Sequence, residues 1–161
     1  MICLDTQPVL WGIQTFASEG QEAMINRTRA FLKDISEKGE QIMIPSPVVL
    51  ESLLTLSDEE IEKQQELLQS RFFIASFDLP ASVEAASLLN NREVIQNLRD
   101  SGARREHIKI DAQIASIAIV NGAEKIISHD KYLKSIVQNK ISVEEVPDIA
   151  EQLNLLGEEN L

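Results

Sequence analysis

Four acidic residues, far apart along the chain, occupy positions where a carboxylate is unusual. Asp5 ends the apolar run MICLD, Glu51 interrupts the apolar stretch VVLESLLTL, and Asp111 lies within the apolar run IDAQIASIAIV. Asp130 follows a further short apolar segment at 125–128. An ionised carboxylate beside a core is costly unless something pairs with it. The pattern therefore predicts that all four acids meet around one divalent cation.

Carboxylate oxygens are the ligands that hard cations prefer, so Mg²⁺ or Mn²⁺ is the expected cofactor. Without a cation, four clustered carboxylates would repel one another and be partly protonated. A divalent cation in such a site would lower the pKa of a bound water and offset charge on a phosphate, which suits phosphodiester hydrolysis. Thr6 and Ser128 lie beside acids and could hydrogen-bond to them, although both could equally cap the helices that follow.

Two of the acids also have a simpler explanation when each is taken alone. Asp5 could serve only as the cap of a helix that follows its strand. Glu51 could be a single exposed acid on a partly buried helix. Asp111 is expected in the first turns of its helix, where the helix dipole would stabilise its charge.

The most basic stretch of the chain, RDSGARREH at 99–107, immediately precedes the segment that carries Asp111. Its cations are well placed to hold phosphates, so the candidates for contact with a nucleic-acid backbone are Arg104, Arg105 and Lys109. A solvated loop whose charges cap a helix is the alternative. The net charge of the chain is −11, which opposes general nucleic-acid affinity and would equally suit a basic protein partner.

The length of 161 residues and the hydrophobic content of 43% predict one globular domain covering 1–161. The single cysteine, Cys3, lies in an expected buried strand and favours a reducing, cytoplasmic setting. No apolar run approaches the length of a membrane span, and the first residues resemble a strand rather than a signal peptide.

Short apolar segments alternate with helical patterns along the chain. Strands are expected at 1–5, 41–44, 72–77, 125–128 and 141–146, the last of them at a sheet edge. A long helix is expected over 80–98 with a break near Asn90-Asn91, and a terminal helix over Ile149–Leu156. This order predicts the α/β class, as a three-layer α/β/α sandwich with a short, mostly parallel central sheet. Strand ends and the helix starts that follow them share one edge of such a sheet, where the acids should meet.

Other chemistries fit the sequence poorly. It contains no CxxC, no HExxH and no glycine-rich phosphate loop. His107 and His129 are too few and too widely separated for a zinc site. A phosphatase with an aspartyl-phosphate intermediate would need a second Asp two residues after Asp5, where Gln7 stands.

The acidic motifs resemble those of PIN-domain proteins, the fold of many prokaryotic toxin ribonucleases. The resemblance rests on four short motifs in the family's order: LDT at Asp5, PSPVVLESL around Glu51, DAQIASIAIVNGA from Asp111 and SHD ending at Asp130. It implies a Mg²⁺- or Mn²⁺-dependent endoribonuclease that cleaves single-stranded RNA, is often a homodimer and is often inhibited by a cognate antitoxin protein.

Two features depart from the family pattern. Gln7 stands where the family commonly has Asn or Ser, and the segment Val83–His107 looks longer than in compact toxins. That segment could carry substrate or partner contacts. Two alternatives stay open at this point: a PIN-like module that holds RNA or a protein without cutting, and a metal-dependent hydrolase of DNA or of a small phosphate ester.

Overall fold

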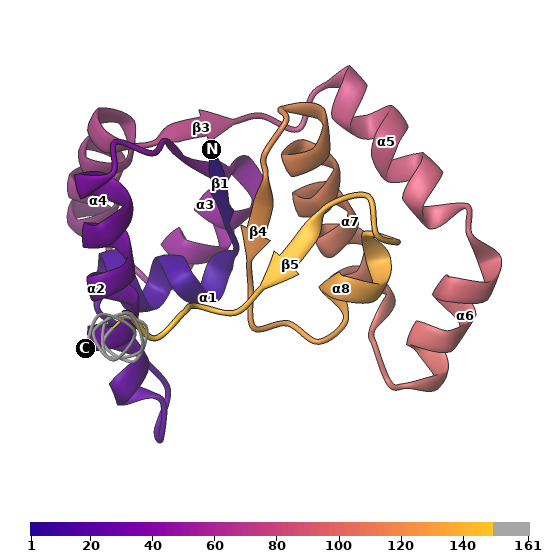
Figure 1. Cartoon of the computed structure of the whole chain (residues 1–161), viewed down its shortest axis with the longest axis horizontal. Coiled ribbons are helices and arrows are strands. Elements are labelled where there is room, and N and C mark those ends of the chain that lie inside the picture. Colours follow the sequence, from indigo (N-terminus) through magenta and orange to yellow (C-terminus); the bar gives the residue numbers. More distant parts are fainter. Residues whose placement is uncertain (150–161) are drawn as a thin grey trace, which may run out of the picture.

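The structure, a computed structural model, describes residues 1–149 (Figure 1). Within these residues the core is a five-stranded sheet of order β3-β2-β1-β4-β5. The strands are β1 (Ile2–Leu4), β2 (Ile42–Pro45), β3 (Phe73–Ala75), β4 (Lys125–Ile127) and β5 (Ser142–Glu144). All four pairings between them are parallel, and β5 lies at an edge as predicted.

Helices connect each strand to the next along the chain. Three follow β1: α1 (Thr6–Val9), the π-helix η1 (Leu10–Gln14) and α2 (Glu22–Glu37). The other connections contain α3 (Ser46–Leu53), α4 (Asp58–Arg71), α5 (Leu79–Leu89), α6 (Arg92–Asp100), α7 (Arg105–Val120) and α8 (Leu133–Ile136). The terminal helix expected over Ile149–Leu156 lies, beyond Ile149, outside the described residues.

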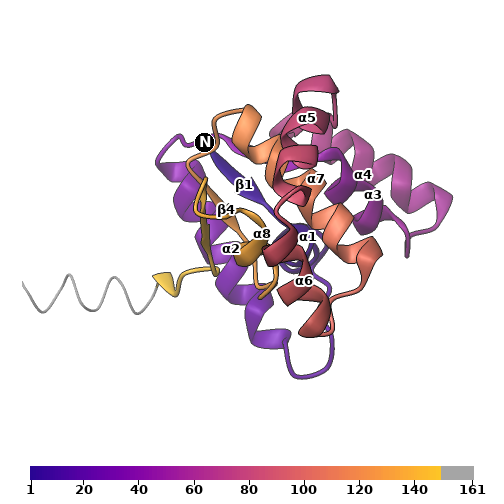
Figure 2. The same cartoon turned by 90° about the vertical axis from the view of Figure 1, so that its right-hand side faces the viewer.

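Two layers of helices cover the two faces of the sheet (Figures 1 and 2). On one face Cys3 and Met43 pack with side chains of α5, α6, α7 and α8. On the other face Leu4 and Ile44 pack with side chains of α1, η1, α2 and α4. Successive strand residues point to opposite faces, so the apolar runs of the strands serve both layers. The predicted three-layer α/β/α sandwich with a parallel sheet is confirmed.

The break near Asn90-Asn91 is also confirmed. Asn91 is the N-cap of α6, and its side chain accepts a hydrogen bond from the Val94 N–H at 3.2 Å. An asparagine cap of this kind satisfies a free amide at the helix start, which explains why the long helical pattern divides here.

The start of α7 differs from the sequence-based expectation. The helix begins at Arg105, so the second half of the basic stretch is helical rather than a loop. Asp111 consequently lies in the second turn of α7. The field of a helix dipole falls off within the first turn, so the dipole gives this carboxylate little of the support that was expected. None of the helices in residues 1–149 has the length and apolar character of a membrane span.

Candidate active site

Two of the four acids follow adjacent strands at the carboxyl edge of the sheet. Asp5 comes directly after β1, and Asp130 follows β4, which is the neighbour of β1. The Asp5 N–H donates to the Ile127 carbonyl at 3.0 Å, and Ser128 Oγ donates to Asp5 Oδ2 at 2.5 Å. Ser128 therefore hydrogen-bonds to Asp5, which is one of the two roles predicted for it.

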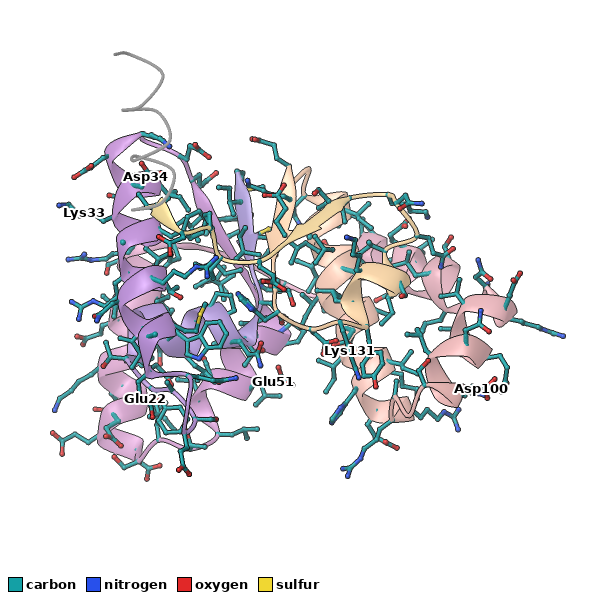
Figure 3. All side chains as sticks on the ribbon, turned by 60° about the horizontal axis from the view of Figure 1, so that its bottom comes forward. Glu22, Lys33, Asp34, Glu51, Asp100 and Lys131 are labelled. Carbon is teal, nitrogen blue, oxygen red and sulfur yellow. The ribbon has the colours of Figure 1, made fainter. Side chains whose placement is uncertain are left out.

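Glu51, on α3, reaches the same edge through Thr6. The Thr6 hydroxyl donates to Glu51 Oε2, and the Thr6 N–H donates to Asp5 Oδ1 at 2.8 Å. Figure 3 shows Glu51 in the middle of the molecule, whereas Asp100 lies at the outer end of α6. The N-cap of α1 is Asp5, not Thr6. Asp5 is thus both a helix cap and a member of the acidic cluster.

Asp111 approaches the cluster from α7. Burial raises its pKa to about 8, with further contributions from the charges of Asp130, Asp5 and Glu51. Its Oδ2 atom is buried and accepts no hydrogen bond from any described residue. A buried acceptor without a donor is costly, and more so when it is ionised. The four acids thus lie close enough to influence one another, and one of them lacks a partner.

Asp5 is nearly inaccessible, with 8% of its surface exposed. Burial raises its pKa, whereas the hydrogen bonds from Ser128 and Thr6 lower it; the charges of Asp130 and Glu51 then raise it further. The two hydrogen-bond donors therefore favour the ionised form of Asp5, whereas the charges of the two neighbouring acids favour its protonated form.

Asp130 closes a turn between β4 and α8. Its Oδ1 accepts the Tyr132 N–H at 2.6 Å, and its own N–H donates to Ser128 Oγ at 2.9 Å. Asp130 does not cap the helix that follows, because the N-cap position of α8 is Tyr132. The Tyr132 amide was missed by the sequence analysis, although an Asp two residues before an amide is a known turn signal.

The fold of this chain, but not its sequence, is similar to that of known proteins. No family model and no curated protein matches the sequence. A chain of VapBC2 from Rickettsia felis, in complex with a DNA fragment from the promoter, is 20% identical, with a TM-score of 0.59 over 90% of this chain and 98% of that chain. A chain of DNA-bound VapBC from Salmonella typhimurium is 15% identical, with a TM-score of 0.55 over 91% and 98%. The chain has a PIN-like fold. The predicted fold resemblance is therefore confirmed.

The basic residues lie at the start of α7 in this PIN-like fold. Arg104, Arg105 and Lys109 are exposed, and none of them forms an ion pair with a residue in 1–149. Residues two apart on a helix point in different directions, so Lys109 does not share the face of Asp111. His107, one turn before Asp111, does share that face and is also exposed.

The four acids are not arranged as a complete metal-binding site among the described residues. Among residues 1–149, no group of three or more His, Cys, Asp and Glu side chains is arranged so that it could hold a metal ion. Donors of the protein instead hold the carboxylates of Asp5, Glu51 and Asp130. The chemistry of the set nevertheless fits Mg²⁺ or Mn²⁺, because every candidate ligand is a hard oxygen and Asp111 Oδ2 has no donor. The ligand set stays a prediction.

Replacement of Ser128 tests how much its hydrogen bond to Asp5 contributes to the stability of the protein. Ser128→Ala leaves Asp5 Oδ2 without its buried donor, and we expect the free energy of unfolding at pH 7 to fall by about 1–3 kcal/mol. Ser116→Ala is the matched control, because this buried hydroxyl donates only to the Gln113 carbonyl within α7. Urea denaturation of both variants measures the difference; equal losses would contradict a special role for the Ser128–Asp5 bond.

Proposed function

We propose that the protein is a divalent-cation-dependent endoribonuclease that hydrolyses phosphodiester bonds of single-stranded RNA. The observation that carries the proposal is Asp111, whose pKa is raised to about 8 and whose Oδ2 lacks a donor beside three other acids. Strongly perturbed carboxyls that share a site are typical of functional centres. The similarity of the fold to chains of VapBC complexes supports a nuclease of the toxin–antitoxin type.

In this proposal the four acids would hold Mg²⁺ or Mn²⁺: Asp5, Glu51, Asp111 and Asp130. The bound cation supplies an acidic water for attack and offsets charge at the phosphate. Thr6 and Ser128 act as positioning residues, because their hydroxyls donate to Glu51 and Asp5 and fix the orientation of these carboxylates. Asp111 must give up a proton when the cation binds, so binding releases protons below pH 8.

The proposed partners follow from charge and from the structural neighbours. Arg104, Arg105 and Lys109 would contact the RNA backbone with cations that are free of ion pairs to described residues. An antitoxin protein is a proposed partner because both neighbours are described as VapBC assemblies, and the net charge of −11 would favour a basic one. A homodimer, with no membrane attachment, completes the proposal.

A non-catalytic module that binds RNA or protein is the second candidate. It is favoured by one observation: the side chains in residues 1–149 do not form a ready ion-binding group. A binding module needs no saturable cation site, whereas a nuclease of the proposed type does. The two candidates therefore differ in a property that can be measured without a substrate.

The test combines cation binding with cleavage by the wild-type protein. Titration calorimetry with Mn²⁺ in two buffers should show a saturable site and proton release. Labelled single-stranded RNA should be cut in Mn²⁺ or Mg²⁺ and left intact with a chelator, while duplex RNA and single-stranded DNA are spared. RNA binding without Mn²⁺ binding or cleavage would establish the second candidate. Equal cleavage of DNA would contradict the RNA specificity.

A further inference from the structure

A small pocket adjoins the acidic cluster on the side of α3. It has a volume of about 260 Å³ and lies between α3, the β3–α5 connection and α7. Most of its wall is apolar, and three polar side chains also line it: the residues are Pro47, Leu50, Phe77 and Ile110, with Ser46, Glu51 and Gln113. Glu51 belongs to both the pocket and the acidic cluster, and Ile110 directly precedes Asp111. Anything bound in the pocket therefore lies next to Glu51, one of the four acids.

The apolar wall of this pocket is exposed but held in place. Leu50 is 62% exposed and Phe77 is 37% exposed. The Phe77 N–H donates to Ser46 Oγ at 3.2 Å, which ties the β3–α5 connection to the start of α3. Neighbouring apolar side chains that stay exposed on fixed backbone are typical of a binding surface.

The side-chain amide of Gln113 is a polar group at the edge of this apolar wall. Its side chain is partly buried, and its amide forms no hydrogen bond with any described residue. A side-chain amide offers two donors and one acceptor oxygen, so it can read the polar edge of an aromatic heterocycle.

We propose that the pocket binds one unpaired nucleobase of the RNA, next to the phosphate that is cut. The base stacks on Phe77 and Leu50, and the Gln113 amide contacts its edge. Pockets for drug-sized ligands hold roughly 300–1,000 Å³, so this volume suits a single base better than a peptide segment. Sequence-specific readers of single-stranded RNA commonly stack bases on aromatic rings and bond to the base edges. The inference rests on the proposed ribonuclease function and names the substrate contact that would give it sequence preference.

A thermodynamic cycle tests the proposal. The cut position is mapped on a single-stranded RNA, and the bases beside it are then replaced one at a time by an abasic ribose. For wild type, one of these replacements should lower kcat/KM by roughly 10–100-fold, the range of one base–aromatic stack. Phe77→Ala should show the same loss with the intact RNA and no further loss with the abasic RNA. Gln113→Ala should cut a wider range of bases at that position.

Phe73→Ala is the matched control. Phe73 is 38% exposed, almost the same fraction as Phe77, but it begins β3 at the opposite end of the strand and lines a different cavity. Its cleavage rates and base preference should equal those of wild type. Binding of the same oligonucleotides to Asp111→Asn, followed by fluorescence anisotropy, gives a second readout that needs no cleavage.

Three outcomes would overturn the proposal. Phe77→Ala could lose nothing relative to Phe73→Ala in both cleavage and binding. The abasic RNA could be cut and bound as well as the intact RNA. A loss in Phe77→Ala could accompany dissociation of a dimer in sedimentation, which would make a second copy of the chain the occupant. If wild type cleaves no RNA, the proposed function fails, and the anisotropy comparison still decides whether the pocket holds a base.

Discussion

Asp111→Asn and Asp5→Asn are each expected to abolish measurable cleavage of single-stranded RNA in Mn²⁺. Loss of a group that only orients a metal ligand already costs about 10–100-fold in activity. Loss of a ligand itself should cost more, so we expect kcat/KM to fall by well over about 100-fold, to below the detection limit of the assay. Gel-based cleavage assays with saturating Mn²⁺ measure the rates, and circular dichroism checks that both variants are folded.

Asp100→Asn is the control for these variants. Asp100 is an exposed acid at the end of α6, far from Glu51 in Figure 3, and its carboxylate accepts a hydrogen bond from Gln96 Nε2 in the same helix. Its cleavage rate should equal that of wild type. If the Asp5 and Asp111 variants cut as fast as this control, the acids do not carry the chemistry.

The same Asp111→Asn variant is expected to be more stable than wild type in the absence of divalent cations. The amide keeps the shape of the side chain and removes a charge that burial and three acids oppose. We expect a gain of roughly 1–3 kcal/mol at pH 9, well below the limit set by the full pKa change, because partial solvation and relaxation reduce such energies. The melting temperature should rise by roughly 2–10 °C.

The stability gain of Asp111→Asn over wild type should change with pH in a direction that can be measured. The folded-state pKa of Asp111 is about 8 and its ordinary value is 3.8, so the folded protein holds the proton more tightly than the unfolded chain. The stability contributed by protonated Asp111 is complete below about pH 4 and is lost as the pH rises to about 8. The Asn variant has no such loss, so its advantage should shrink as the pH is lowered. A stability gain that grows at acidic pH would contradict the burial of this carboxyl. Added Mn²⁺ should stabilise wild type but not the Asn variant.

The fold could be predicted from sequence because local patterns and global architecture agree. Apolar segments of strand length alternate with amphipathic helical segments, and this order alone specifies a parallel sheet between helical layers. The positions of Asp5 and Asp130 followed from the same logic, because strand ends of a parallel sheet share one edge. The Asn90-Asn91 break was visible because asparagine is a strong helix cap.

Contacts between distant segments could not be predicted in the same way. The Thr6 hydroxyl bonds to Glu51, 45 residues away, and no local pattern specifies that pair. The isolated Asp111 oxygen is likewise a property of packing, since it depends on which donors the neighbouring elements bring. The sequence also misplaced the start of α7, because the charged residues Arg105 and Glu106 suit a first helical turn as well as a loop. The base pocket was missed since Phe77 was assigned to a strand.

The bond between Ser128 and Asp5 joins residues that are 123 positions apart. During protein synthesis, at about 5–20 residues per second, roughly 6–25 s separate the appearance of these two side chains. Through that interval β1 lacks β4, its neighbour in the finished sheet, and the first acid lacks Ser128 and Asp130. Under the proposed ribonuclease function, the acidic cluster of a nascent chain would therefore stay incomplete, and the chain inactive, until the segment that carries Ser128 and Asp130 has been synthesised.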